Sequence, residues 1–487
     1  MDFAFNNSFH DAMEGFYAPA EAAKPSVPML LAFNPVLAAR LGLVSDGVND
    51  DQIARIFSGM EMPAGANPLA FAYAGHQFGH FSAQLGDGRA LLLGEIIAPD
   101  GARFDVQLKG SGPTAFSRNG DGKAAIGPVL REFLVSEAMA AMGVPTTRSL
   151  AAVATGDRVQ REQTHPGAVL TRIASSHIRV GTFQFFAAHF GVEHVTQLSD
   201  YTIHRHFLEL AAASNRHLAL LDRVIGLQCD LVAHWLGIGF IHGVMNTDNV
   251  AISGETIDYG PCAFMDRFAV ETVFSSIDAN GRYAYGRQPQ IMHWNMARFA
   301  EALLPAIHAV DPADVDRAKA MVEAIPDRFR VIWHHRMRSK LGLVQAGEAD
   351  GRLIDALFAE LEQHRVDFTS FFRALAQLLR GDGATLQALL PDAEAMAPWI
   401  ADWWVQFERF AIAPLERADA MDAVNPVYIP RNHQVERALV AAEAGDMAPW
   451  RALLEVVQNP YVVRPEWDDY AHPAPIDSVP HVTFCGT

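Results

Sequence analysis

Residues 241–252 read Ile241-His242-Gly243-Val244-Met245-Asn246-Thr247-Asp248-Asn249-Val250-Ala251-Ile252, and Asp258-Tyr259-Gly260 follows shortly after them. Asp248, Asn249 and Asp258 carry small oxygen-bearing side chains, and we expect them in loops that flank a short strand. Such an arrangement can bring two or three oxygen ligands onto one hard cation, typically Mg²⁺ or Mn²⁺. Each residue alone could simply form a turn. Three of them together, between an apolar helix and a Gly-Pro turn, favour a metal site.

A lysine and a glutamate form a second candidate group. Lys109 ends a predicted strand over residues 104–108 and could reach a phosphate as a point charge. Glu132 comes 23 residues later, in a helix predicted to begin at Pro128 and to end before Gly143. Taken singly, each fits a solvated position equally well. As a pair, they predict a lysine held in place by a positioning carboxylate.

Glycines and arginines form a third group. The turn Gly86-Asp87-Gly88 precedes Arg89 and would let the backbone approach a ligand closely, although two glycines are a weak signal. Arg172 lies near the end of a predicted strand over residues 168–173 and Arg179 follows it. Both could contact phosphate oxygens, or both could be ordinary surface arginines. Asp121 and Gly122 complete this set of candidates.

Composition excludes several classes of protein. The 487 residues include 38 basic and 56 acidic side chains, for a net charge of −18, so binding to a nucleic-acid backbone is not expected. The cysteines, Cys229, Cys262 and Cys485, form no C-x-x-C pair, which disfavours structural zinc and indicates a reducing compartment. Apolar runs fall far short of the ~18 residues of a membrane span. We therefore expect a cytoplasmic protein that binds neither membranes nor nucleic acid.

The order of predicted elements indicates an α+β fold. Strands are predicted at residues 89–97, 104–108, 151–154 and 168–173, whereas long amphipathic helical patterns cover residues 207–235 and 355–380. We expect a β-rich N-terminal lobe over residues 1–182 and a larger, mainly helical lobe over residues 183–487. The second lobe contains the loop region 242–260 and a C-terminal extension. The active site should lie in the cleft between the lobes.

Two rival motifs are not supported. Gly122-Lys123 is followed by alanine, and a serine stands where a phosphate-binding P-loop needs its first glycine. His76 and His80 are four residues apart, but the glycines around them make a helix unfavourable. We therefore expect these histidines to be structural and not metal ligands.

In chain order, the parts follow those of protein kinases: a glycine turn, a strand lysine, a helix glutamate, a catalytic loop and a D-F-G-like triplet. Counted from His242, the kinase base position falls on Val244, which cannot accept a proton. Asn249 is in register with the metal-binding asparagine, and Asp258 begins the triplet. The sequence thus predicts a kinase-like scaffold that lacks the usual base but has a carboxylate at Asp248.

The chain closely resembles the selenoprotein O family of kinase-like protein adenylyltransferases, the YdiU-type proteins of bacteria. The resemblance extends over nearly the whole chain. It is carried by long, unusual strings: Tyr73-Ala74-Gly75-His76-Gln77-Phe78-Gly79, Gln84-Leu85-Gly86-Asp87-Gly88-Arg89-Ala90, Gln107-Leu108-Lys109-Gly110-Ser111-Gly112, Arg118-Asn119-Gly120-Asp121-Gly122-Lys123, Val169-Leu170-Thr171-Arg172-Ile173-Ala174, the 242–260 segment and Pro430-Arg431-Asn432-His433.

The resemblance implies a two-lobed pseudokinase fold in which ATP binds in a flipped orientation. AMP would pass from ATP to a Ser, Thr or Tyr hydroxyl of a protein, and pyrophosphate would leave; bacterial relatives also transfer UMP from UTP. It implies Asp248 as proton acceptor, Glu132 as the residue that positions Lys109, and Asn249 and Asp258 as ligands of Mg²⁺ or Mn²⁺. The nucleotide contacts it implies are Gly86, Gly88, Arg89, Lys109, Asp121, Gly122, Arg172, Arg179 and Asp258. A carboxylate beside a metal should be a weak base, so Asp248 could instead orient the hydroxyl.

The resemblance also suggests redox control. Eukaryotic relatives carry selenocysteine three residues from the end, where this chain has Cys485. A disulfide between Cys485 and Cys262 is one hypothesis. The alternative is an idle tail thiol and a buried structural Cys262.

Three functions follow from these observations. The leading hypothesis is a Mg²⁺-dependent protein adenylyltransferase. The second is a conventional kinase that transfers the γ-phosphate, against which Val244 argues. The third is a nucleotide-binding pseudokinase scaffold without activity, against which the joint presence of Asp248, Asn249 and Asp258 argues.

Overall fold

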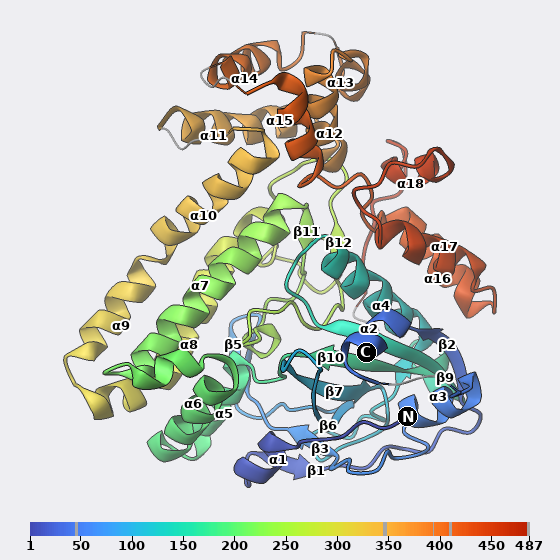
Figure 1. The fold of residues 1–487 in the computed structure, drawn as a ribbon, viewed down its shortest axis with the longest axis vertical. Coiled ribbons are helices and arrows are strands. Elements are labelled where there is room, and N and C mark those ends of the chain that lie inside the picture. The colour runs from blue at the N-terminus through green and yellow to red at the C-terminus, as the bar shows by residue number, and fades with distance from the viewer. Residues whose placement is uncertain (44–46, 344–347, 393, 409–411, 485–487) are drawn as a thin grey trace.

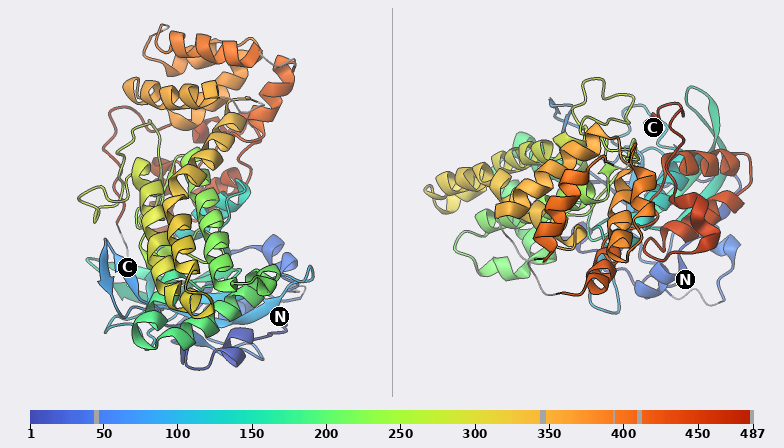
Figure 2. Two further views of the ribbon diagram at one scale, coloured as in Figure 1. Left: turned by 90° about the vertical axis from the view of Figure 1, so that its left-hand side faces the viewer. Right: turned by 90° about the horizontal axis from the view of Figure 1, so that it is seen from above.

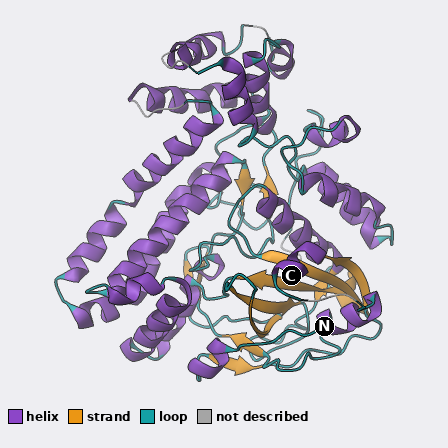
Figure 3. Ribbon diagram, viewed as in Figure 1, coloured by secondary structure: helices purple, strands orange, loops and turns teal. Residues whose placement is uncertain are grey.

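The chain is an α+β protein with a β-rich N-terminal region and a helical C-terminal part (Figures 1 and 3). The computed structural model describes residues 1–43, 47–343, 348–392, 394–408 and 412–484. The β-rich region extends to residue 174, and long helices dominate from residue 180 onwards. The two regions are continuous in sequence and lie against each other in space.

An antiparallel sheet of eight strands forms the centre of the β-rich region. Its order is β1-β3-β6-β7-β10-β9-β2, with β8 paired to β10. In that order, the strands are Tyr17–Pro19, Leu69–Phe71, Ala90–Ile97, Arg103–Lys109, Thr164–Ala174, Arg148–Gln160 and Met29–Phe33, with β8 at Ala124–Ala125. Two short hairpins lie outside this sheet: β4 (Gly75–Gln77) with β5 (His80–Ser82), and β11 (Phe240–Ile241) with β12 (Ala263–Phe264).

Alternation along the strands divides the sheet into two faces. Side chains of a strand point alternately to opposite faces. Leu91, Val106, Leu108 and Val169 pack with α2 and α3 on one face. The other face carries Leu92 and Leu170, which join the core formed with helix α4. Gln107, Lys109 and Arg172 occupy alternate positions of β7 and β10 on this second face. The same period that buries the core therefore turns these polar side chains toward the helical region.

Helices cover the sheet and build the rest of the molecule. Those of the β-rich region are α1 (Ser8–Ala12), α2 (Pro35–Arg40), α3 (Asp50–Phe57) and α4 (Ile126–Ala141). The next group is α5 (Val180–His189), α6 (Val192–His206), α7 (Arg216–Gly237), α8 (Gln288–Val310), α9 (Asp314–Glu323) and α10 (Ile325–Lys340). The remaining helices are α11 (Glu348–Gln363), α12 (Phe368–Leu379), α13 (Ala384–Leu389), α14 (Ala397–Glu408), α15 (Pro414–Asp422), α16 (Asn432–Glu443), α17 (Ala448–Val457) and α18 (Asp468–Ala471).

The helical part has two outlying groups. Helices α11–α15 lie at the end of the molecule remote from the sheet (Figures 1 and 2) and share a second hydrophobic core with the adjoining ends of α7 and α10. Helices α16 and α17 return to the β-rich region and pack on α4. There the Trp450 indole donates to the Leu130 carbonyl at 3.1 Å, and the Trp450 ring packs on Phe133. The C-terminal extension thus supports the helix that carries Glu132.

The predicted strands are present, three of them as parts of longer strands and the first, predicted at residues 89–97, as Ala90–Ile97, but several predicted helix limits are wrong. Helix α4 begins at Ile126, two residues before Pro128, because a proline is tolerated throughout the first turn, where backbone N–H groups lack intrahelical acceptors. The stretch 207–235 is not one helix, since Asn215 caps a new start by accepting from the Leu218 amide at 3.2 Å. Asp367 divides 355–380 in the same way. The proposed boundary after residue 182 falls inside α5 and stays a prediction.

No helix in the described ranges combines the length and the apolar character needed to cross a membrane.

The Pro430-Arg431-Asn432-His433 string is a structural junction. Arg431 is fully buried and pairs with Asp266 at 2.6 Å and with Asp367 at 2.7 Å, while it also donates to the Ala471 carbonyl at 2.8 Å. Asn432 bonds both the amide and the carbonyl of Phe264 in β12. One arginine therefore joins the segment after Asp258, helix α12 and helix α18.

We predict that Arg431→Leu lowers the free energy of unfolding by about 3–5 kcal/mol, because it leaves buried carboxylates without a partner. Urea denaturation measures this change. Arg287→Ala is the matched control: it removes an ion pair to Glu271 whose side chains are 44% and 62% exposed, and should change the free energy by less than about 1 kcal/mol. Equal effects of the two variants would contradict the assignment.

Candidate active site

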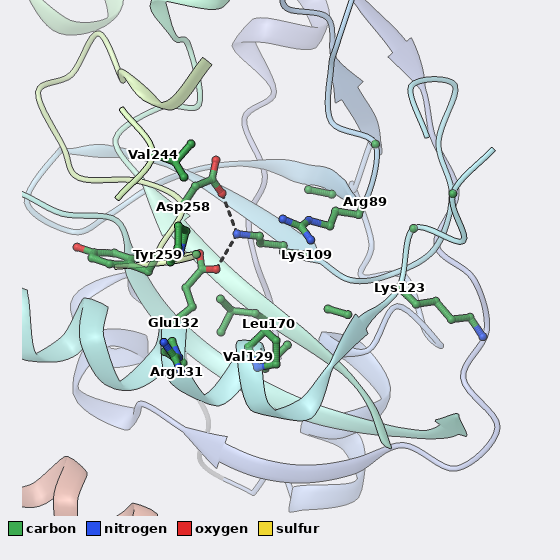
Figure 4. A pocket seen from close by; sticks show the side chains of 18 of the residues that line it. Arg89, Lys109, Lys123, Val129, Arg131, Glu132, Leu170, Val244, Asp258 and Tyr259 are labelled. Atoms are coloured by element: carbon green, nitrogen blue, oxygen red, sulfur yellow. Dashed lines mark hydrogen bonds and ion pairs between the residues drawn. The ribbon is translucent and has the colours of Figure 1, made fainter. Parts of the chain in front are cut away.

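Lys109 lies at the meeting point of the two regions. Its ammonium nitrogen is 2.6 Å from the Glu132 carboxylate and 2.8 Å from the Asp258 carboxylate (Figure 4). Strand β7 supplies the lysine, helix α4 the glutamate, and the loop before β12 the aspartate. The pairing of Lys109 with Glu132 is the contact that their spacing suggested, and Asp258 makes it a three-residue cluster.

Two buried arginines share Asp258 with Lys109. Arg172 Nη1 is 2.6 Å from Asp258 Oδ1, and Arg179 Nη1 is 2.9 Å from Asp258 Oδ2. Arg172 also lies 3.3 Å from Glu132, and Arg179 lies 3.4 Å from Asp87. Both guanidinium groups are only 2% exposed. Three cations therefore converge on one carboxylate.

This arrangement fixes the charge of Asp258. Burial alone would raise the pKa of its carboxyl group, but Lys109, Arg172 and Arg179 hold that pKa well below its ordinary value. Asp258 also has a backbone φ of +62°, a left-handed conformation that aspartate tolerates better than most residues. The loop thus turns its carboxylate into the cation cluster, and the carboxylate stays ionised.

Asp248 lies in the short 3-10 turn Thr247–Asn249 and contacts the β4–β5 hairpin. A Cβ added to Gly75 would lie 2.3 Å from Asp248 Oδ1, so only glycine allows this approach. Asp248 Oδ1 is buried and has no hydrogen-bond partner among the described residues. Burial raises the pKa of Asp248 to about 6, although the Arg179 charge opposes this. In the protein alone, Asp248 is therefore a stronger base than an ordinary aspartate.

Asn249 and Asp258 both line the cavity and carry oxygen atoms of the kind that bind divalent cations. The Asn249 amide nitrogen donates to the Val244 carbonyl at 2.9 Å, which leaves its carboxamide oxygen as the free ligand atom. Asp258 Oδ2 accepts one charged donor, and a carboxylate oxygen has two lone pairs. No cluster of three or more His, Cys, Asp or Glu side chains in the described residues could hold a metal. Two protein oxygens suit Mg²⁺, which commonly completes its shell with water and phosphate.

A cavity of about 1000 Å³ contains the predicted site residues. Gly86, Gly88, Arg89, Asp121 and Gly122 are among the residues that line it. Gly86 has a φ of +109°, and a Cβ there would lie 2.4 Å from the Phe116 ring, so the turn requires glycine. Among the described residues, Arg89 has no ion-pair partner. The Asp121 carboxylate pairs with Arg161 at 2.9 Å and sits at the edge of the cavity.

The sequence analysis missed several residues that hold this site together. Asp87 accepts from the Gln107 amide at 3.0 Å, and Gln107 accepts from Arg172 Nε at 3.1 Å. The Tyr73 ring packs against the Arg179 guanidinium at 4.6 Å. Asp87 lay between the two noted glycines and Gln107 two positions before Lys109, so strand alternation could have identified Gln107. Arg118, Lys123 and Arg161 also line the cavity.

Only one cysteine of the proposed disulfide, Cys262, lies in the described part of the chain. Cys262 is a buried free thiol, and burial raises its pKa to about 12, which suppresses the thiolate. Cys485 lies outside the described residues. The disulfide hypothesis therefore stays a prediction.

Comparisons with known proteins agree with the resemblance seen in the sequence. The family described as protein adenylyltransferase SelO matches residues 1–458. The chain is 76% identical over 487 residues to protein nucleotidyltransferase YdiU of Sphingopyxis alaskensis, covering all of both chains. It is 52% identical over 491 residues to the protein of the same name in Cereibacter sphaeroides, again over the full length of both. The corresponding protein of Rhizobium leguminosarum is 51% identical and is covered over 97% of its length.

We predict that Asp258→Asn destabilises the protein by about 3–5 kcal/mol, because three cations lose their shared negative charge. Added inorganic tripolyphosphate should then raise the melting temperature of the variant more than that of the unchanged protein, since the anion binds the folded state only. Thermal unfolding with and without tripolyphosphate measures both effects. Asp51→Asn, which removes an exposed charge elsewhere, is the control. Equal tripolyphosphate shifts in the three proteins would contradict an anion-binding cluster.

Proposed function

The chain belongs to the protein adenylyltransferase SelO family, and from this premise we propose that it transfers AMP from ATP to hydroxyl groups of proteins. Transfer of UMP from UTP is the related reaction of the same site. The observation that carries the proposal is the convergence of Lys109, Arg172 and Arg179 at a large cavity beside Asp248.

Phosphate binding follows from the charge of this cluster. Buried cations have lost their hydration, so an anion that binds them directly is strongly stabilised. Guanidinium groups can donate two parallel hydrogen bonds to phosphate oxygens. Lys109, Arg172 and Arg179 would hold the β- and γ-phosphates, and Arg89, with no carboxylate partner in the described residues, is available to the nucleotide as well. Glu132 keeps the Lys109 ammonium in place at 2.6 Å when Asp258 turns to another ligand. With the β- and γ-phosphates held by these cations, the α-phosphate would face Asp248.

Asp248 would accept the proton of the attacking hydroxyl. Its carboxylate oxygen Oδ1 has no hydrogen-bond partner within the described ranges and its pKa is raised toward neutrality, two properties that suit a general base. Arg179 donates to the Asp248 carbonyl at 2.9 Å and so links the base to the phosphate-binding cluster. Because Arg179 contacts both the Asp248 loop and the phosphate-binding cluster, it would fix the base relative to the phosphates. This favours an in-line attack of the substrate hydroxyl on the α-phosphorus.

A bound Mg²⁺ or Mn²⁺ would neutralise negative charge on the triphosphate and its leaving group. Asn249 and Asp258 would hold it. Asp258 already has three cationic neighbours, so the triphosphate, and not the protein, would balance the charge of the ion.

We also propose that the scaffold is kinase-like. A strand lysine paired with a helix glutamate, followed by a loop with Asn249 and a triplet begun by Asp258, is the arrangement that active kinases use. Val244 lines the cavity at the position of the kinase base and cannot accept a proton. The carboxylate at Asp248 therefore supports nucleotidyl transfer over γ-phosphate transfer or a scaffold without activity. The buried free thiols Cys229 and Cys262 support a cytoplasmic location.

We predict that label from ATP marked at the α-phosphate becomes protein-bound in the presence of Mg²⁺, and that label from the γ-phosphate does not. Asp248→Asn should lower the transfer rate by about 10²-fold or more, because general bases contribute on that scale. Its affinity for ATP should be unchanged or higher, since a negative charge near the phosphates is removed. Transfer of γ-label would identify a kinase, and absence of transfer of either label would identify a scaffold.

A further inference from the structure

The β4–β5 hairpin contacts the loop that carries Asp248. The His76 amide donates to Thr247 Oγ1 at 2.7 Å, and the Phe78 amide donates to Asn246 Oδ1 at 3.1 Å. Tyr283 also donates to Asn246 Oδ1 through its hydroxyl at 2.6 Å. The two residues that precede Asp248 are therefore both bound to the hairpin backbone.

Thr247, Gln184 and His76 form a closed ring of hydrogen bonds. Thr247 Oγ1 is 2.6 Å from Gln184 Oε1, and Gln184 Nε2 is 2.9 Å from His76 Nδ1. The direction of the ring follows from the orientation of the Gln184 carboxamide, whose Oε1 lies toward Thr247 and whose Nε2 lies toward His76. In this orientation Thr247 accepts from the His76 amide and donates to Gln184 Oε1, and the Gln184 amide nitrogen donates to His76 Nδ1. This arrangement requires a neutral His76 with its proton on Nε2.

None of the three residues lines the cavity. Thr247 is fully buried, Gln184 is 6% exposed, and neither they nor His76 is among the lining residues. They cannot touch a bound nucleotide directly. Any effect on the reaction must pass through the residues that they hold.

The geometry around Asp248 shows how that effect would be transmitted. A Cβ at Gly75 would lie 2.3 Å from Asp248 Oδ1, and one at Gly181 would lie 2.2 Å from the Ala74 carbonyl and 3.2 Å from Asp248 Cα. Two glycines thus bring the hairpin backbone against Asp248, with no space for adjustment. A shift of His76 moves Gly75, its neighbour, and with it the wall against which the carboxylate rests.

We propose that the Thr247–Gln184–His76 ring positions Asp248 for proton transfer, and that Thr247 and Gln184 are positioning residues of the reaction. The inference rests on the proposed function for the identity of the reaction, but the ring itself is a property of the protein alone. Its two parts can therefore be tested separately.

The kinetic test compares Thr247→Val, Thr247→Ser and Thr202→Val. Valine keeps the shape of threonine and removes the hydroxyl, whereas serine keeps the hydroxyl. Thr202 is the matched control, because it is fully buried and its hydroxyl bonds the Leu198 carbonyl at 2.7 Å, away from the site. The assay uses α-labelled ATP with a degenerate peptide mixture that contains Ser, Thr and Tyr.

Thr247→Val should lower kcat by about 10- to 100-fold, the scale of a misplacement of about 1 Å, while KM for ATP stays within about twofold. Thr247→Ser should recover most of kcat, and Thr202→Val should keep it even if its melting temperature falls. A Thr247→Val enzyme with unchanged kcat would overturn the proposal. So would equal losses of kcat in Thr247→Val and Thr202→Val, because they would indicate a general loss of stability.

The second measurement does not depend on activity. Nitrogen-15 NMR of the His76 ring should show a proton on Nε2 in the unchanged protein and in Thr247→Ser, and a mixture of tautomers in Thr247→Val. A proton on Nδ1 in the unchanged protein would overturn this arrangement of donors and acceptors, and the same tautomer ratio in all three proteins would overturn the link between Thr247 and His76, whatever the enzyme transfers. If the ring is present but the protein-bound label comes from the γ-phosphate of ATP, the proposed function fails. The kcat comparison, repeated with γ-labelled ATP, then still decides whether the ring positions Asp248.

Discussion

One carboxylate, that of Asp258, binds three cations, two of them from the β-rich region, and thereby connects that region to the helical part. Lys109 and Arg172 come from adjacent strands, and Arg179 precedes helix α5. A buried charge is tolerated only when it is paired, so these four side chains depend on one another. The register of β7 and β10, the position of α4 and the left-handed backbone at Asp258 together bring these side chains into contact.

The same junction supplies the positive charge with which, as we propose, this acidic protein binds a triphosphate. The chain has a net charge of −18, yet its cavity concentrates Lys109, Arg172, Arg179 and Arg89, the last of which has no ion-pair partner in the described part of the chain. In low-dielectric surroundings such charges attract phosphate far more strongly than they would at the surface. Glu132 and Asp87 remain as partners for the cations, so ligand binding can replace one carboxylate contact without disrupting the cluster.

The sequence predicted the four longest strands and the residues that meet at Lys109, because alternation along a strand and spacing along a helix are local properties. It missed Asp87, Gln107 and the Thr247–Gln184–His76 ring. Asp248 and Gly75 lie far apart in the chain, and no periodicity reports which glycine faces which carboxylate. His76 was expected to be structural; its role as a hydrogen-bond acceptor for Gln184 is visible only in three dimensions.

The central claim is that the α-phosphate, and not the γ-phosphate, lies next to Asp248. The most direct measurement is a crystal structure of the protein with Mg²⁺ and a non-hydrolysable ATP analogue. The account predicts the terminal phosphates at Lys109, Arg172 and Arg179, with the α-phosphorus the one nearest to Asp248 Oδ1. A structure with the γ-phosphorus nearest to Asp248, and the adenine ring at the cation cluster, would contradict it.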